Sequence, residues 1–265
     1  MANLLQKVIQ YYHHVNYELM DPRSVDVFYV RSPLPWMVLV GVYIYGVTAL
    51  GPKLMRNRKA FKVEGIIRIY NITQIIVNVY MFKLALNVVT NKEFNWKCMP
   101  LRFDTGEYSM EILHGCYWFF WLKVYDLMDT VFFILRKKNS QVTFLHVYHH
   151  ALMVFASWMS LKYLPGGNPI LLGFVNVFVH AVMYTYYLLT SIDPKYKKLI
   201  WWKKHLTQLQ MAQFMLIAIH SSQILFRKYC GYPKFFAFVL VLQNLFIFSL
   251  FCNFYWKTYC MKKKS

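Results

Sequence analysis

The sequence predicts an all-α, polytopic membrane protein with seven transmembrane helices. Of its 265 residues, 58% are hydrophobic and only 15% are charged, whereas soluble domains carry roughly a quarter charged residues. The mean hydropathy is positive. Seven apolar segments reach or approach the roughly 20 residues that a helix needs to cross a bilayer. We therefore expect residues 1–265 to form a single membrane domain.

Helix-breaking residues bound these segments. Pro33 and Pro35 open the first span and Gly51-Pro52 closes it. The first span is uniformly apolar and carries no obvious chemistry, so we expect it to be peripheral. A Pro-Gly-Gly sequence at 165–167 predicts a tight turn between the fourth and fifth spans. The predicted spans are residues 34–51, 66–90, 110–135, 142–162, 170–191, 206–226 and 235–256.

The distribution of basic residues predicts the topology. One set of loops contains 17 Lys and Arg residues and the opposite set contains 9. The richer set comprises residues 52–65, 136–141, 193–204 and 257–265; the poorer set comprises 1–32, 91–109, 163–169 and 227–234. By the positive-inside rule, the segment 1–32 is lumenal and the tail 257–265 is cytosolic. No cleavable signal peptide is evident, because residues 1–32 lack an apolar core before a small-residue cleavage site.

A net charge of +19 could also indicate a nucleic-acid binder. Here the basic residues lie in short runs between apolar segments, which is typical of membrane-flanking loops. We therefore expect a lipid bilayer as the partner and no nucleic acid.

Cysteine and lysine positions give two further predictions. Cys98 and Cys230 both fall in loops on the lumenal side, where disulfides persist. A bridge between them is favoured over two free thiols. Lys262 and Lys263 are the fourth and third residues from a predicted cytosolic C-terminus. This position is typical of a dilysine retrieval signal of the endoplasmic reticulum, although an ordinary basic membrane flank has the same composition.

Three histidines dominate the chemistry of the chain. His146, His149 and His150 stand at i, i+3 and i+4 in an apolar segment, so a helix places them on one face. Burying three imidazoles is costly without a function. Their positions lie within about 15 Å of the cytosolic start of the fourth span.

Other polar residues interrupt the neighbouring spans at a similar predicted depth. Intramembrane polar groups of this kind are candidates for function, although pairing of Lys123 with an aspartate and glutamine bonds between helices would explain part of the set. They are Lys123, Asp126 and Asp129 in the third span, Asn176, His180, Tyr184 and Tyr187 in the fifth, and Gln210 and Gln213 in the sixth.

Four motifs together resemble the signatures of the ELOVL family of very-long-chain fatty acid elongases. The HxxHH box alone is weak, but the four in this order are specific. Asp126 departs from the family, which usually has Glu there. The motifs are Lys123-Val-Tyr-Asp126-Leu-Met-Asp129-Thr130, His146-Val-Tyr-His149-His150, His180-Ala-Val-Met183-Tyr184-Thr-Tyr186-Tyr187 and Thr207-Gln-Leu-Gln210-Met-Ala-Gln213.

The resemblance implies a condensing enzyme of the endoplasmic reticulum membrane. It would convert a long-chain acyl-CoA and malonyl-CoA to 3-ketoacyl-CoA, CoA and carbon dioxide. The last six helices would form a bundle or barrel around a narrow acyl tunnel. The CoA thioesters are substrates, so no cofactor and no metal are expected. Other enzymes of the elongation cycle and a second copy of the chain are candidate partners.

The resemblance also suggests roles for the polar residues. The polar cluster contains no cysteine, so an imidazole is the available nucleophile. Similarity to the family suggests His149, with His180 close to the acyl carbon. His146 would be oriented by Asp129, and His150 and Asn176 would stabilise the thioester enolate.

The remaining candidates would bind the substrates. Lys123, Asp126, Tyr184, Tyr187, Gln210 and Gln213 lie among the motifs. Cations at the cytosolic mouth would bind the CoA phosphates, although they also serve as topology signals. They are Arg136, Lys137, Lys138, Lys203, Lys204 and Lys257.

Two alternatives remain. A di-iron membrane fatty acid desaturase or hydroxylase also uses HxxHH boxes, but it needs about eight imidazole ligands. This chain has nine histidines and one such box. A seven-helix lipid-binding receptor or carrier would need no nucleophile and would tolerate the loss of His149.

Overall fold

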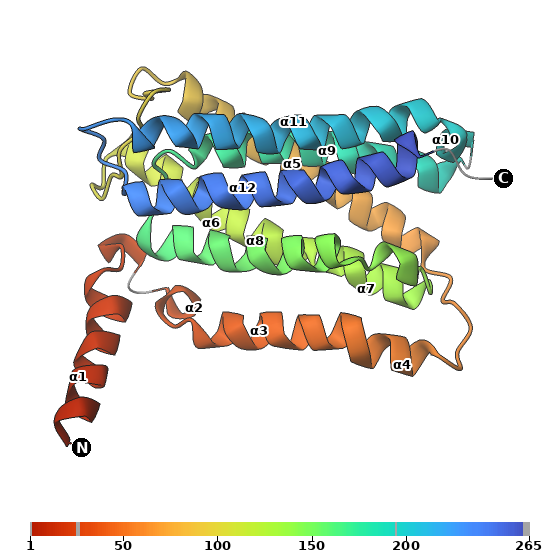
Figure 1. Ribbon diagram of the computed structural model, residues 1–265, viewed down its shortest axis with the longest axis horizontal. Coiled ribbons are helices and arrows are strands. Elements are labelled where there is room, and N and C mark those ends of the chain that lie inside the picture. The colour runs from red at the N-terminus through yellow and green to blue at the C-terminus, as the bar shows by residue number, and fades with distance from the viewer. Residues whose placement is uncertain (1, 25–26, 194, 262–265) are drawn as a thin grey trace.

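A computed structural model describes residues 2–24, 27–193 and 195–261. Within these residues the chain is almost entirely helical, and its extended pairing is limited to an isolated bridge between Leu101 and Gly166. The long helices lie side by side along one common direction (Figure 1). Helix α1 (Ala2–His13) is the exception and runs across that direction. The α-helices that follow it are α2 (Phe28–Arg31), α3 (Leu34–Tyr45), α4 (Gly51–Met55), α5 (Glu64–Thr90), α6 (Glu107–Asp126), α7 (Met128–Leu135), α8 (Phe144–Tyr163), α9 (Ile170–Ile192), α10 (Lys195–Lys198), α11 (Ile200–Leu225) and α12 (Lys234–Tyr255).

Four helical segments are long and apolar enough to cross a membrane. They are Leu34–Met55, Glu64–Thr90, Ile170–Ile192 and Lys234–Cys260. Helices also form at the other three predicted spans, as α6 with α7, as α8 and as α11. The predicted third span is interrupted, because α6 ends at Asp126 and α7 begins at Met128.

The predicted end of the first span was wrong. The helix continues through a π-helical turn, Gly46–Leu50, into α4 and ends at Met55. Proline inside a helix cannot donate to the preceding turn, and here the π-helical turn lies directly before Gly51-Pro52 and lets the helix continue. A Cβ on Gly51 would lie 2.8 Å from a methyl carbon of Ile134, so glycine lets this helix approach α7.

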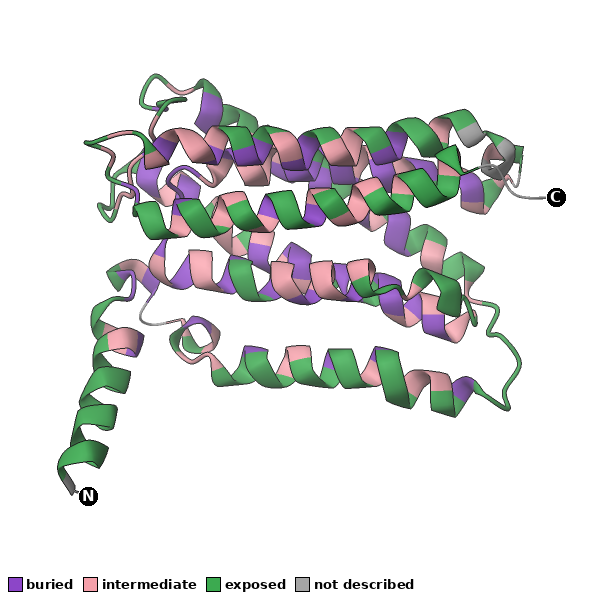
Figure 2. Cartoon of the chain, in the orientation of Figure 1, coloured by how far each residue is buried: buried purple, intermediate pink, exposed green. Residues whose placement is uncertain are grey.

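The helices pack in pairs, α5 along α9, α11 along α12, α6 along α8 and α3 against α8. Buried residues concentrate between α5, α6, α8 and α9, while much of α3 and α12 is exposed (Figure 2). An aromatic cluster of Tyr29, Trp36, Phe120 and Trp121 fixes the start of α3 to α6. As predicted, the first span lies at the periphery of the bundle.

The two ends of the bundle differ. α1 lies at one end, which we call the α1 end (Figure 1). There Cys98, after α5, and Cys230, before α12, form a disulfide with a Cα–Cα distance of 5.9 Å. The opposite, basic end carries the end of α7 and of α12 and the start of α8 and of α11. Lys262 and Lys263 lie outside the described residues.

Candidate functional site

The histidine face of α8 begins in the first turn of the helix. Thr143 caps α8, and its Oγ1 accepts a hydrogen bond from the backbone N–H of His146 at 3.2 Å. Such a cap satisfies one of the free N–H groups of the first turn. The rings of His146 and His150 are 4.2 Å apart, and those of His149 and His150 are 5.9 Å apart. The helix therefore brings the three imidazoles onto one face.

The partner predicted for His146 was wrong. Its Nε2 is 2.9 Å from Oγ1 of Thr130, and that hydroxyl is 2.7 Å from the hydroxyl of Tyr43 in α3. Asp129 instead accepts a hydrogen bond from the hydroxyl of Tyr184 at 2.7 Å. Successive residues of a helix point about 100° apart, so Thr130 faces α8 while Asp129 faces α9.

A buried carboxylate, Asp126, organises the second half of the site. Lys123 Nζ lies 2.9 Å from Oδ2, and Gln74 Nε2 donates to Oδ1 at 2.7 Å. Nδ1 of His180 is 3.7 Å from Oδ2. A buried ion pair requires further hydrogen bonds to offset the loss of water, and Gln74 supplies one. Lys123 therefore pairs with Asp126, which settles a choice that the sequence left open.

Three polar residues of α5 belong to this cluster, although the sequence analysis missed them. Tyr70, Gln74 and Asn78 are buried and lie four residues apart. Asn78 Nδ2 donates to Oε1 of Gln74 at 3.2 Å, and Gln74 Nε2 donates to the hydroxyl of Tyr70 at 2.8 Å. This spacing of polar residues in an apolar span is the signal that could have identified them.

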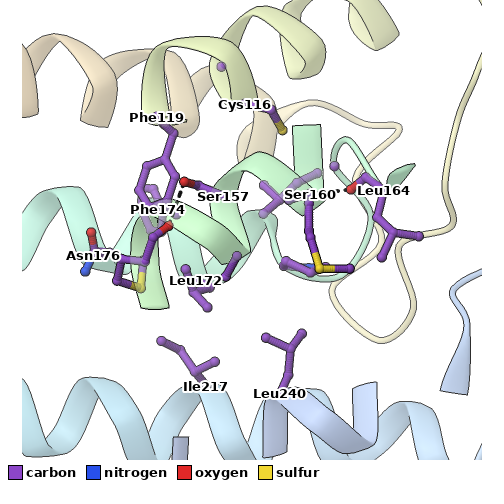
Figure 3. A pocket seen from close by; sticks show the side chains of 18 of the residues that line it. Cys116, Phe119, Ser157, Ser160, Leu164, Leu172, Phe174, Asn176, Ile217 and Leu240 are labelled. Atoms are coloured by element: carbon purple, nitrogen blue, oxygen red, sulfur yellow. Dashed lines mark hydrogen bonds between the residues drawn. The ribbon is translucent and has the colours of Figure 1, made fainter. Parts of the chain in front are cut away.

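An apolar cavity of about 510 Å³ opens next to the histidine face. Residues of α5, α6, α8, α9, α11 and α12 line it. Figure 3 shows side chains of α8 and α9 on one side and Ile217 and Leu240 on the other, with open space between them. Its volume falls within the usual range of small-molecule sites, about 300–1,000 Å³.

Several polar atoms in this cavity wall are buried without a hydrogen-bond partner in the described part of the chain. They are His149 Nδ1, Asn176 Oδ1, Gln213 Oε1 and Gln243 Nε2. Such groups are rare in folded proteins. An imidazole and three amides that border an apolar space can bind a polar group attached to an apolar chain once their side chains turn toward it.

The other predicted residues lie further from the cavity. In the described structure, His146, His150 and His180 are not part of its lining. Gln210 Nε2 contacts Met183 Sδ at 3.6 Å, and Tyr187 is exposed with its ring 5.9 Å from that of Tyr184.

The predicted cations all lie at the basic end. Lys138, Lys203, Lys204 and Lys257 are exposed. Lys137 instead donates to the backbone carbonyls of Arg56 and Arg58 at 3.2 and 2.9 Å, and Arg136 Nε is 3.9 Å from Glu64 Oε1. Two of the six cations are thus already engaged within the chain.

Among the residues that the structure describes, the histidine cluster is not part of a set of metal ligands. Within residues 2–24, 27–193 and 195–261, no three histidine, cysteine or acidic side chains form a group that could hold a metal ion. His146 is partnered by a hydroxyl, His149 lines the cavity, and Asp126 is paired with an ammonium and hydrogen-bonded by an amide.

Fold and site together define a helical membrane protein with a buried histidine cluster beside an apolar cavity. The sequence pattern of the GNS1/SUR4 family, ELO, matches residues 28–265. The chain belongs to this family.

Three similar proteins are named very long chain fatty acid elongases. A very long chain fatty acid elongase of Aedes aegypti is 38% identical, over 98% of this chain and 73% of its own length. Very long chain fatty acid elongase 7 of Drosophila melanogaster is 38% identical, over 90% of this chain and 73% of its own length. Very long chain fatty acid elongase 1 of Homo sapiens is 34% identical, over 100% of this chain and 92% of its own length.

Proposed function

We propose that the protein catalyses the condensation step of fatty acid elongation. It joins a long-chain acyl-CoA to malonyl-CoA and releases 3-ketoacyl-CoA, CoA and carbon dioxide. The observation that carries the proposal is His149, whose Nδ1 lies unpartnered, within the described structure, at the wall of an apolar cavity. The names of the relatives support the same class of reaction.

The proposed reaction has two half-reactions. The His149 imidazole attacks the thioester carbonyl, the C–S bond breaks, and CoA leaves as the thiolate, which takes up the ring proton that the acylated imidazole loses. The acyl chain then occupies the cavity as an acyl-imidazole. In the second half, malonyl-CoA loses carbon dioxide to give a thioester enolate. Its carbon attacks the acyl carbonyl, so the new C–C bond forms as the C–N bond to the imidazole breaks. The released imidazole takes up a proton from solvent.

Neighbouring groups would support these steps. Asn176 lies in the cavity wall with His149, and its amide can bind a developing oxyanion when the side chain turns its N–H₂ toward it. His150 is the second candidate for this role. Thr130 fixes the ring of His146, and Asp126 lies beside His180. Gln213 would hydrogen-bond the substrate at the cavity wall.

The proposal includes an orientation in the membrane. Seven helical spans would cross the endoplasmic reticulum membrane, with the α1 end in the lumen and the basic end in the cytosol. The positive-inside rule supports this direction. Lys138, Lys203, Lys204 and Lys257 would then meet the CoA phosphates, the cavity would form part of an acyl tunnel, and Lys262 and Lys263 would act as a retrieval signal. The oxidising lumen would maintain the Cys98–Cys230 disulfide.

Intact mass spectrometry tests the covalent step. Purified protein is incubated with a long-chain acyl-CoA in the absence of malonyl-CoA. We expect a mass increase of one acyl group that maps to His149, that disappears in His149→Ala, and that malonyl-CoA discharges as 3-ketoacyl-CoA. His114→Ala is the matched control, because His114 is exposed and lies outside the cavity.

Other outcomes point to other mechanisms. Malonyl-CoA-dependent product without an adduct would keep the elongase and reject the acyl-imidazole. An adduct that persists in His149→Ala would move the nucleophile to another residue. Neither adduct nor product, together with two tightly bound irons, would favour the desaturase. Binding of acyl-CoA without turnover would favour the carrier.

A further inference from the structure

Helix α1 has a continuous apolar face that no part of the described structure covers. Leu4, Leu5, Val8, Ile9 and Tyr12 recur at helical spacing, and we call them the α1 apolar face. Each of them is between 49% and 70% exposed. The opposite side carries Asn, Gln and Lys side chains. An amphipathic helix of this kind in a folded protein normally buries its apolar stripe.

The direction of α1 distinguishes it from the other long helices. It runs steeply across the common direction of α3, α8 and α12, at the end of the bundle and away from its core (Figure 1). It is exposed along almost its entire length (Figure 2). Since the bundle helices cross the bilayer, a helix set across their direction at one end lies parallel to the membrane surface.

A set of buried contacts fixes the level at which α1 leaves the bundle. Lys162, the penultimate residue of α8, is fully buried. Its Nζ donates to Asn16 Oδ1 at 2.9 Å and to the carbonyl of Arg31 at 2.7 Å. Its own carbonyl accepts from the N–H of Asp21 at 2.8 Å. The segment that follows α1 is therefore tied to the end of α8, and the same lysine also holds the end of α2, just before α3.

We propose that α1 is an interfacial helix that binds the lipid leaflet at the α1 end of the bundle. The α1 apolar face would enter the upper acyl-chain region, and Lys7, Gln6 and Gln10 would meet the headgroups and water. Helices of this type bury their apolar side roughly 5–10 Å into the interface. Tyr11 and Tyr12 suit that depth, because tyrosine is enriched at membrane surfaces.

The charge of α1 indicates which lipids it needs. Lys7 is the only Lys, Arg, Asp or Glu in Ala2–His13. Binding would therefore depend on apolar burial and not on attraction to anionic lipid. A zwitterionic phosphatidylcholine leaflet should be sufficient. The adjoining surface of α3 is also apolar and exposed, at Leu34, Met37 and Val38, so α1 continues a lipid-facing surface.

Site-directed spin labelling of the full chain tests this proposal. Cys116, Cys252 and Cys260 are replaced by serine and the Cys98–Cys230 disulfide is kept. Single nitroxides are placed at Leu5 and Ile9, and matched controls at Gln6 and Gln10, in phosphatidylcholine nanodiscs. We expect Leu5 and Ile9 to collide readily with oxygen and to be protected from a water-soluble nickel chelate. Gln6 and Gln10 should show the reverse.

Two outcomes would overturn the proposal. Equal nickel accessibility at all four positions would place α1 in water. Protection of Leu5 and Ile9 from both oxygen and nickel, with broadening from a nearby second label, would mean that another copy of the chain covers the face. Elongase activity plays no part in either readout, so the test is independent of the proposed function.

Discussion

Gln74 is the residue that holds Asp126 in place. Its Nε2 donates to the carboxylate at 2.7 Å, and its Oε1 is held by Asn78. The other contact to the same oxygen, from the hydroxyl of Tyr184, is longer at 3.4 Å. Because Oδ2 of Asp126 faces both Lys123 and His180, a rotation of this carboxylate would change the surroundings of both.

Replacing Gln74 should therefore affect turnover more than binding. A hydrogen bond to a charged group contributes about 1.5–3 kcal/mol, so Gln74→Leu should lower kcat by roughly tenfold to a hundredfold. KM for the acyl-CoA should change little, because Gln74 does not line the cavity. Steady-state kinetics with purified protein would measure both constants.

A second glutamine provides the control for this variant. Gln208 is exposed on α11 and bonds the hydroxyl of Tyr255, so Gln208→Leu should retain normal kinetics. If Gln74→Leu folds and turns over like the unmodified protein, the position of Asp126 does not limit the reaction. A rise in KM alone would instead place Gln74 in substrate binding.

Local sequence patterns identified some site residues and could not identify others. His146, His149 and His150 share a helix face through their spacing alone, and the structure keeps them together. Which side chain would meet His146 depends on how α7 is rotated against α8. That rotation is a property of packing, and it places Thr130 against His146 where Asp129 was predicted. Gln74 was not identified as a site residue from the sequence, because its partner, Asp126, lies 52 residues away in the sequence.

At the scale of elements, α3 contributes more than the sequence indicated. It is peripheral, yet the hydroxyl of Tyr43 reaches Thr130, which in turn contacts His146. Hydropathy located this helix but could not show that one tyrosine points inward. The same limit applies to Gly51-Pro52, where proline at the start of α4 continues a helix that it was expected to end.

The Tyr43 hydroxyl can be tested within its own helix. Tyr43→Phe removes the hydroxyl that holds Thr130 Oγ1, which in turn contacts His146 Nε2. A neutral hydrogen bond contributes about 1 kcal/mol, so activity should fall about fivefold. Tyr45→Phe is the matched control, since Tyr45 is exposed and should keep full activity.

Different results for this pair would separate two explanations. Equal activity of Tyr43→Phe and Tyr45→Phe would mean that α3 only packs against the bundle. A loss of activity in Tyr43→Phe with an unchanged melting temperature would support positioning of His146. A parallel loss of activity and stability would indicate that the hydroxyl stabilises the contact between α3 and α7.

At the scale of the whole molecule, composition predicted the class of fold and not its arrangement. Hydropathy located helices at all seven predicted segments, because burial in lipid requires long apolar runs. The pairing of α5 with α9 and the cavity among six helices depend on side-chain shape. The break between α6 and α7 also left no recognisable signal in the sequence.

The Cys98–Cys230 disulfide joins two connections that are 132 residues apart. The same region is held by a hydrogen bond from Leu101 N–H to the carbonyl of Gly231 at 3.3 Å. A covalent link over so long a loop stabilises a fold by about 2–5 kcal/mol, mainly by restricting the unfolded chain. The serine double variant Cys98→Ser/Cys230→Ser should therefore unfold at a lower temperature.

Thermal unfolding in detergent, with and without reductant, would measure this effect. Reductant should lower the melting temperature of the unmodified protein and leave that of the double variant unchanged. Cys260→Ser, which removes an exposed free thiol, should behave like the unmodified protein. The prediction would be contradicted if the unmodified protein had the same melting temperature with and without reductant while thiol titration showed that the disulfide was fully reduced. Tyr232 lies near this disulfide and also lines the cavity. If the cavity holds the acyl chain as we propose, loosening this end should impair its retention before it disturbs the histidines near the basic end.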